Sequence, residues 1–188
     1  MGKIVSNFFI SLDGVVESPE KWHFPYFNDE MGAAVERGMR TAGAFLMGRV
    51  LYDAWSAYWP GQERNPGTPE QADAFAEFIN DVPKYVVSNT LKNPAWHDTT
   101  VVSGDVATRL RKIKEETDGD IGMFGSATLV RWLLANDLLD ELNLLVHPIV
   151  VGHGQRLFEQ GPTHPLRLVR SETFKTGVLD LTFTPAAG

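Results

Sequence analysis

Cysteine is absent from the 188 residues of this chain. Its absence excludes disulfides, thiolate metal sites and a cysteine nucleophile, and it fits a reducing compartment. The sequence also lacks an apolar run approaching the roughly 18 residues that a membrane-spanning helix needs. Lys3 is followed at once by strand-like sequence, which leaves no room for a signal peptide. We therefore expect a cytoplasmic protein without a membrane partner.

Positive charge is also in short supply. The formal net charge is −7 and the isoelectric point is near 5.2, so the electrostatic attraction that dominates nucleic-acid binding would be repulsive here. Nucleic acid is accordingly not an expected partner, and any phosphate must be bound by local features. The length suits one well-packed domain over residues 1–188.

Several catalytic signatures are missing. There is no G-x-S-x-G elbow of a hydrolase and no phosphate-binding P-loop pattern, and Gly152-x-Gly154 lacks the third glycine of a dinucleotide fingerprint. The histidines show no helical metal-ligand spacing, so we expect no metal site. They are His23, His97, His147, His153 and His164.

What the sequence does contain is an alternation of strand and helix patterns. Strands are predicted at residues 3–12, 44–47, 84–88, 99–103, 120–124 and 141–151. Helices are predicted at residues 28–40, 49–59, 70–80, 105–117 and 127–136, with an exposed loop at residues 60–69. Segments 166–174 and 178–184 flank Thr176-Gly177, which predicts an antiparallel hairpin. The pattern is typical of an α/β fold with a mostly parallel sheet.

Two predicted strands turn directly into helices at glycine. One turn is Gly48-Arg49, and the other is Gly125-Ser126 followed by Ala127. Unpaired amides and the positive end of the helix dipole at such turns suit a phosphate, although ordinary strand-to-helix connections look the same. Arg49 could bind a phosphate with two hydrogen bonds or form a structural ion pair.

The order of these motifs resembles the dihydrofolate reductase-like superfamily. Within it, the sequence is most similar to the C-terminal reductase domain of riboflavin-biosynthesis deaminase-reductases and to their stand-alone bacterial relatives. The resemblance covers nearly the whole chain. The motifs that carry it are Ser11-Leu-Asp-Gly14, Met47-Gly-Arg49, Val87-Ser-Asn89, Phe124-Gly-Ser-Ala-Thr-Leu129, Leu138-Leu-Asp-Glu-Leu142 and Pro148-Ile-Val-Val-Gly-His-Gly154.

This resemblance implies a three-layer fold with helices on both faces of the sheet, a homodimer formed through the C-terminal strands, and a bound NADPH, with NADH as the alternative. It assigns cofactor binding to positions on three turns, which are Gly48, Arg49, Ser88, Asn89, Gly125, Ser126, Ala127 and Thr128. Two positions depart from the family pattern. Ser126 stands where the family often has a second glycine, and Asn89 stands where a basic residue often follows the serine. Simple turn chemistry explains Ser88 and Asn89 as well as a role in cofactor binding does.

On the substrate side, the aromatic segment before residue 28 resembles the tryptophan, proline and helix-borne acid of dihydrofolate reductases. The resemblance makes Asp29, or its neighbour Glu30, a candidate proton relay, but an acid at a helix start is favoured by the dipole alone. Asp13 would hydrogen-bond a heterocycle or form an Asx turn. A planar substrate would lie against an aromatic wall of Trp22, Phe24 and Phe27, or these residues form the core of their loop.

The sequence thus predicts an NAD(P)H-dependent reductase that transfers hydride to a small heterocyclic or carbonyl-bearing substrate, of pterin, pyrimidine or flavin type. A non-catalytic nucleotide- or ligand-binding protein on the same fold is the alternative. A riboflavin-pathway reductase proper would need a site for a substrate phosphate, and Lys21 is the only cation in the loop between Asp13 and Asn28.

Overall fold

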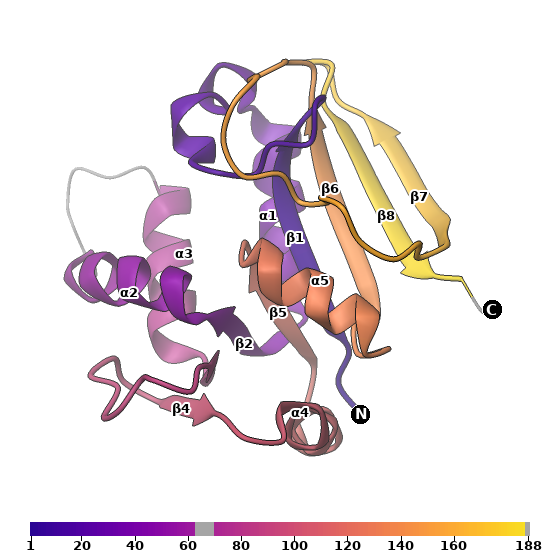
Figure 1. The fold of residues 1–188 in the computed structure, drawn as a ribbon. Helices are drawn as coiled ribbons and strands as arrows, with labels where there is room; N and C mark the ends of the chain where they lie inside the picture. The colour runs from indigo at the N-terminus through magenta and orange to yellow at the C-terminus, as the bar shows by residue number, and fades with distance from the viewer. Residues whose placement is uncertain (63–69, 187–188) are drawn as a thin grey trace.

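The computed structural model describes residues 1–62 and 70–186, and a single mixed sheet runs through it (Figure 1). The strands are β1 (Ile4–Ser11), β2 (Ala42–Gly48), β3 (Lys84–Val87), β4 (Thr99–Val102), β5 (Asp120–Phe124), β6 (Glu141–His147), β7 (Leu166–Thr173) and β8 (Leu179–Pro185). The helices are α1 (Asp29–Arg40), α2 (Arg49–Tyr58), α3 (Glu70–Asp81), α4 (Val106–Glu116) and α5 (Ala127–Ala135), with short 3-10 turns η1 (Pro19–Lys21), η2 (Phe24–Tyr26) and η3 (Trp59–Gly61). Most of the predicted loop at 60–69 lies outside the described residues.

The strand order is β4-β3-β2-β5-β1-β6-β8-β7, so the first strand of the chain lies near the centre of the sheet. Strands β1 to β6 pair in parallel, whereas β8 is antiparallel to both β6 and β7. The predicted α/β class is therefore confirmed, and so is the C-terminal hairpin. Gly177 closes that hairpin at a φ of 85°, a conformation that glycine adopts without strain.

Helices cover both faces of the sheet, as expected for a parallel sheet that must be buried on two sides (Figure 1). Alternate residues of β1 point to opposite faces. Ile4, Phe8 and Ile10 pack with α4 and α5 in the largest core cluster. On the other face Phe9 packs with α1, and Phe45 of β2 packs with α2 and α3. These layers are the three-layer arrangement that the resemblance to the dihydrofolate reductase-like superfamily implies.

Local chemistry explains where two of these elements begin and end. Asn28 caps α1, since its side-chain oxygen accepts a hydrogen bond from the Met31 amide at 3.0 Å, as predicted. The strand predicted at 141–151 ends instead at His147. Pro148 follows it and has no amide hydrogen to continue the ladder, so the prediction was four residues too long.

The parallel arrangement brings the carboxyl ends of β1, β2 and β5 to one edge of the sheet. Strand β5 pairs with both β1 and β2. The turns that follow β2 and β5, at Gly48 and Gly125, therefore lie next to each other. Strand β1 runs beyond the end of β5, because Asn7 pairs with Phe124 and β1 continues to Ser11, so the loop that follows β1 lies further along the same edge (Figure 1). Ligands of open α/β sheets bind at this edge.

Candidate functional site

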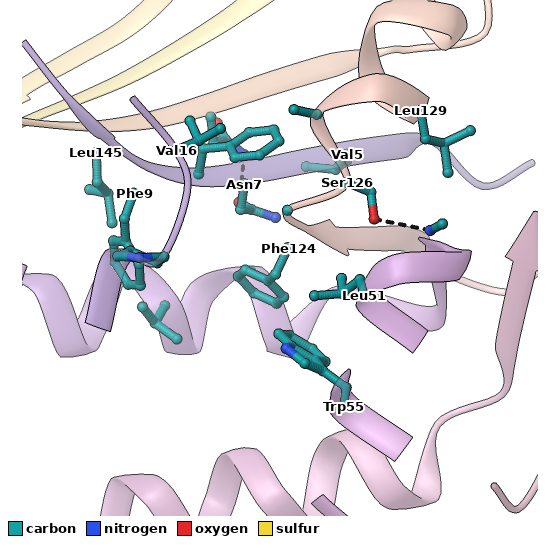
Figure 2. A pocket seen from close by; sticks show the side chains of 18 of the residues that line it. Val5, Asn7, Phe9, Val16, Leu51, Trp55, Phe124, Ser126, Leu129 and Leu145 are labelled. Carbon is teal, nitrogen blue, oxygen red and sulfur yellow. Dashed lines mark hydrogen bonds between the residues drawn. The ribbon is translucent and has the colours of Figure 1, made fainter. Parts of the chain in front are cut away.

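A cleft opens at the carboxyl ends of these three strands. Figure 2 shows its inner surface, where Asn7 and Phe9 from β1, Phe124 from β5, and Leu51 and Trp55 from α2 surround one space. Both predicted glycine turns and the aromatic loop after β1 also contribute residues to the lining. The structure thus brings the separate sequence motifs together at one site.

The two glycine turns are joined by a direct hydrogen bond (Figure 2). The Ser126 hydroxyl accepts it from the Gly48 amide at 3.0 Å. A Cβ atom on Gly48 would lie 3.6 Å from the Ser126 hydroxyl oxygen, so the turns are in close contact. Ser126 itself has a φ of 61°, in the left-handed region that favours glycine. This bond fixes the start of α2 against the start of α5.

The N-termini of both helices retain amides without an intrahelical acceptor. In α5, the first amide bonded to a preceding backbone carbonyl is Val130, which donates to Ser126. Neither Gly48 nor Ser126 caps its helix with a side chain. Ala127 and Thr128 line the cleft, and their backbone amides belong to this first turn of α5. Two helix dipoles converge there, which makes this end of the cleft attractive to a phosphate group.

Arg49 lines the same end of the cleft. Its Nε atom donates to the Asp53 carboxylate at 2.7 Å, one turn along α2, and one terminal nitrogen donates to the Thr90 hydroxyl at 3.3 Å. The structural ion pair considered from the sequence is therefore formed. The side chain is 39% exposed, and a guanidinium has five donors, so Arg49 keeps donors for a ligand.

The strand end at Ser88 is arranged differently. The Ser88 hydroxyl oxygen accepts hydrogen bonds from the amides of Thr90 and Leu91, at 3.2 and 3.0 Å. Ser88 is buried and does not line the cleft, whereas Asn89 does. Of this pair, the structure places only Asn89 where a cofactor could contact it.

The wall opposite β1 is an aromatic stack that the sequence reasoning missed. Trp55 and Phe124 both stack on Phe45, with ring centroids 5.6 and 5.7 Å apart, and Phe75 packs edge-on against both. Trp55, Phe75 and Phe124 line the cleft. The helical spacing of Trp55 indicates a buried face, but spacing does not distinguish a core from the wall of a cleft.

The predicted aromatic wall of the loop is divided. Phe24 and Phe27 line the cleft and are 63% and 40% exposed. Trp22 is buried instead, and its indole nitrogen donates to the Glu17 carbonyl at 3.2 Å while its ring meets the His147 ring edge-on. Trp22 therefore belongs to the core of the loop and does not line the cleft.

Two histidines lie in this aromatic cluster, and the sequence reasoning considered them only as metal ligands. His23 stacks on Phe9 with 4.5 Å between centroids and lines the cleft. His147 is fully buried, and its Nδ1 lies 2.8 Å from the Leu145 carbonyl. Burial, and then the neighbouring His147, lower the pKa of His23 to about 4. Burial also lowers the pKa of His147. Both rings are therefore neutral near pH 7.

The candidate acids lie outside the cleft. Asp29 is exposed in the first turn of α1. Glu30 accepts hydrogen bonds from the Lys175 amide at 2.8 Å and from Asn28 at 2.7 Å, so it joins α1 to the β7–β8 turn. Neither residue lines the cleft.

Asp13 joins the end of β1 to a distant loop. Its carboxylate accepts hydrogen bonds from the Ser11 hydroxyl at 2.7 Å and from the amides of Val151 and Gly152 at 3.0 and 2.9 Å. These bonds hold the pKa of Asp13 well below its usual range. Asp13 does not line the cleft, and its hydrogen bonds suit a structural carboxylate.

Polar side chains also occur on the sheet beneath α1. The Asn7 amide donates to the Met123 carbonyl at 3.2 Å, and Asn143 donates to the Asn7 carbonyl oxygen at 3.2 Å. Thr182 in turn donates to Asn143 at 2.7 Å. Asn7 is thereby held in one orientation in the cleft.

Across residues 1–62 and 70–186, no group of three or more histidine, aspartate or glutamate side chains is arranged to hold a metal ion. No helix in the described part of the chain is long and apolar enough to cross a membrane.

Comparisons with known proteins agree with this arrangement. An uncharacterized protein of Bacillus subtilis (strain 168), YyaP, is 25% identical over 183 residues, which are 96% of this chain and 94% of that protein.

Among solved structures, a protein of Shewanella sp. PV-4, named as a candidate riboflavin biosynthesis protein, is similar with a TM-score of 0.74 and 19% identity over 100% of both chains. Dihydrofolate reductase from Enterococcus faecalis, complexed with NADP(H), has a TM-score of 0.62 and 12% identity, covering 99% of this chain and 98% of that one. These likenesses establish a dihydrofolate reductase-like fold. The model of the RibD C-terminal domain matches residues 2–179, and this chain therefore belongs to the RibD C-terminal domain family.

Proposed function

We propose that this protein is an NAD(P)H-dependent reductase that transfers hydride to a small heterocyclic or carbonyl-bearing substrate. The observation that carries the proposal is the hydrogen bond between Ser126 and Gly48, which holds two helix N-termini together beside an apolar cleft. A dinucleotide has a pyrophosphate that suits such amides and a flat ring that suits the neighbouring aromatic wall. Membership of the RibD C-terminal domain family supports the same activity.

In this proposal the pyrophosphate is bound by the amides of the Gly125-to-Thr128 turn, and Arg49 contacts a phosphate on the adenosine side. The nicotinamide ring lies further along the cleft, toward Phe9. The protein's contribution is to orient the two reactants and exclude water, because the cofactor supplies the hydride. NADPH is the proposed cofactor, with NADH as the alternative. Asn89 supplies no positive charge for a 2′-phosphate, so Arg49 is the cation placed to distinguish the two.

The direct test is titration of the protein with NADPH and NADH, followed by nicotinamide fluorescence. Arg49→Ala should weaken NADPH binding by about ten-fold or more, because a charge-assisted hydrogen bond contributes about 1.5–3 kcal/mol. Lys112→Ala is the matched control, since Lys112 forms an exposed ion pair with Glu116 one turn along α4 and does not line the cleft. Unchanged affinity in Arg49→Ala would refute the role of Arg49. Absence of binding to both nucleotides would refute the proposed function.

A second function, binding without turnover, is favoured by one observation. Asp13, Asp29 and Glu30, the acids considered as proton relays, do not line the cleft. Steady-state oxidation of NADPH with a set of heterocycles separates the two functions, because a protein that only binds gives saturable fluorescence changes and no consumption of NADPH.

We also propose that the protein forms a homodimer through its C-terminal strands. Strand β7 is at the edge of the sheet, and its Leu168 and Val169 side chains are exposed. An exposed apolar edge strand is a common site of pairing with another chain. Light scattering of the purified protein gives the oligomeric state, and a monomer at micromolar concentration would contradict this proposal.

A further inference from the structure

We propose that Asp53, Thr90 and Ser88 are positioning residues for Arg49, and that the guanidinium they hold in place makes the protein prefer a cofactor with a 2′-phosphate. This inference rests on the proposed function and names the residues that set the choice between NADPH and NADH. None of the three lines the cleft, so each acts on the cofactor only through Arg49.

The Arg49 side chain is held from two separate elements. Its Nε atom donates to both carboxylate oxygens of Asp53, at 2.7 and 2.9 Å, one turn further along α2. Its Nη1 atom donates to the Thr90 hydroxyl at 3.3 Å, in the segment that follows β3. A guanidinium has five N–H groups, and these contacts use one on each of two nitrogens. The plane of the guanidinium is therefore fixed, and the remaining N–H groups are available to a phosphate in the cleft.

Ser88 fixes the position of Thr90. Its hydroxyl oxygen accepts hydrogen bonds from the amides of Thr90 and Leu91, at 3.2 and 3.0 Å, and the Ser88 and Thr90 hydroxyl oxygens lie 3.4 Å apart. Ser88 is buried, whereas Thr90 is exposed. A buried residue at the end of β3 thus orients an exposed hydroxyl that reaches the start of α2. This arrangement gives Ser88 a role in cofactor binding without a contact to the cofactor.

The orientation of Arg49 matters because positive charge is scarce along the cleft. Among the described residues that line it, the cations are Arg37, Arg49 and Arg170. Arg37 and Arg170 both pair with Asp180 of β8, whereas Arg49 lies beside the glycine turns. A phosphate near these turns therefore meets one guanidinium and not a cluster of charges. Binding by a single guanidinium depends on how its planar donors are aimed.

Asp53 has two opposite effects on a phosphate at Arg49. Its negative charge repels the phosphate, but the carboxylate also orders the guanidinium and so reduces the conformational freedom lost on binding. The Asp53 side chain is 54% exposed, so water and salt weaken the repulsion. We therefore expect the ordering effect to be the larger one. The two effects predict opposite changes in affinity when Asp53 is replaced, which makes the inference testable.

The test compares dissociation constants for NADP⁺ and NAD⁺, which differ only in the 2′-phosphate. Each nucleotide is titrated by calorimetry into the wild type and the variants. The wild type should bind NADP⁺ about ten-fold or more tightly than NAD⁺, as expected for a charge-assisted hydrogen bond. Asp53→Ala and Thr90→Val should each lower this preference by about three-fold or more, because a mobile guanidinium loses more freedom on binding. Ser88→Ala should change the preference in the same direction, and NAD⁺ affinity should stay unchanged in all three variants.

A conservative replacement and a matched control separate positioning from stability. Asp53→Asn keeps a side-chain oxygen that can accept from Arg49 Nε, so it should retain more of the preference than Asp53→Ala. Glu116→Ala is the control, because Glu116 forms an exposed pair with Lys112 one turn apart on α4 and lies outside the cleft. It should leave both affinities unchanged. Thermal melting reports whether each variant folds, and Asp53 and Thr90 lie on different elements, so either variant tests the inference without the other.

The outcomes separate the inference from the proposed function. An unchanged or increased preference for NADP⁺ in Asp53→Ala would overturn the role of Asp53, and an unchanged preference in Thr90→Val would overturn that of Thr90 and Ser88. Wild-type protein that binds NADP⁺ and NAD⁺ equally well keeps the proposed function and loses the inference. Wild-type protein that binds neither nucleotide contradicts the proposed function itself.

Discussion

Replacing Ser126 tests whether the two glycine turns form one binding site. The Ser126 hydroxyl accepts the Gly48 amide at 3.0 Å, a bond that contributes about 1 kcal/mol when partly buried. Ser126 also has a φ of 61°, which costs a residue with a side chain about 1 kcal/mol or slightly more. Replacement by alanine removes the hydrogen bond and keeps the unfavourable backbone conformation, whereas replacement by glycine removes the hydrogen bond and relieves that conformation.

The two variants should therefore differ in stability. Ser126→Ala is expected to lower the free energy of unfolding by about 1–2 kcal/mol, because the Gly48 amide loses its acceptor. Ser126→Gly should remain within about 1 kcal/mol of the wild type, since relief at positive φ offsets the lost bond. Both variants should bind NADPH more weakly than the wild type, because the start of α2 is no longer fixed against α5.

Urea denaturation followed by tryptophan fluorescence measures the stability difference, and fluorescence titration measures NADPH affinity. Each variant serves as the control for the other. If Ser126→Gly were less stable than Ser126→Ala, the strain argument would fail. If both variants bound NADPH like the wild type, the bond between the turns would have no role in binding.

Three further changes test other parts of the structure. Gly43→Ala should lower the free energy of unfolding, measured in urea, by more than about 3 kcal/mol, because the new Cβ atom would lie 1.8 Å from the Asp118 carbonyl oxygen. The control Gly161→Ala should leave stability unchanged, since no atom lies within 4 Å of a Cβ atom at that position. Asp13→Asn should lower the urea midpoint, since the new amide nitrogen cannot accept hydrogen bonds, and an unchanged midpoint would argue against the structural role of Asp13. In the folded protein the pKa of His23 is about 4, below its ordinary value of 6.5. The neutral buried ring therefore stabilises the fold fully above about pH 6.5, and this stability is lost as the pH falls toward 4. His23→Phe should abolish this loss, which amounts to at most about 3 kcal/mol, and an acid sensitivity equal to that of the wild type would contradict the explanation.

The sequence was sufficient to predict features that depend on neighbouring residues. The N-cap at Asn28, the strand-to-helix turns at Gly48 and Gly125, and the hairpin at Gly177 each follow from the chemistry of a few adjacent positions. The repeated strand and helix patterns then favoured a mostly parallel sheet. The end of β6 was misplaced by four residues, because the apolar residues after Pro148 look like a continued strand, and β2 begins at Ala42, two residues before the predicted start.

Features that depend on strand order could not be read from spacing. Ser126 meets Gly48 across 78 positions because β5 pairs with β2. His23 stacks on Phe9 because the loop after β1 folds back over its own strand. Asp13 shows the same limit for a single residue. An Asp-Gly pair after a strand is typical both of a structural turn and of a ligand-binding site, and only the hydrogen bonds of Asp13 to the Val151 and Gly152 amides distinguish the two.

Two titratable side chains near the end of β1, His23 and Asp13, bear on the pH dependence of turnover. A general acid with a pKa near neutrality gives a rate that falls as the pH rises through that pKa. The pKa of His23 is about 4, and hydrogen bonds hold that of Asp13 well below its usual range. Neither group changes its charge near neutral pH, so we expect the proton that accompanies hydride transfer to reach the substrate from water. We therefore expect kcat for NADPH oxidation to be independent of pH from about pH 6 to about pH 8. A kcat that falls ten-fold per pH unit within that range would place a titrating acid in the cleft and would contradict water as the source of the proton.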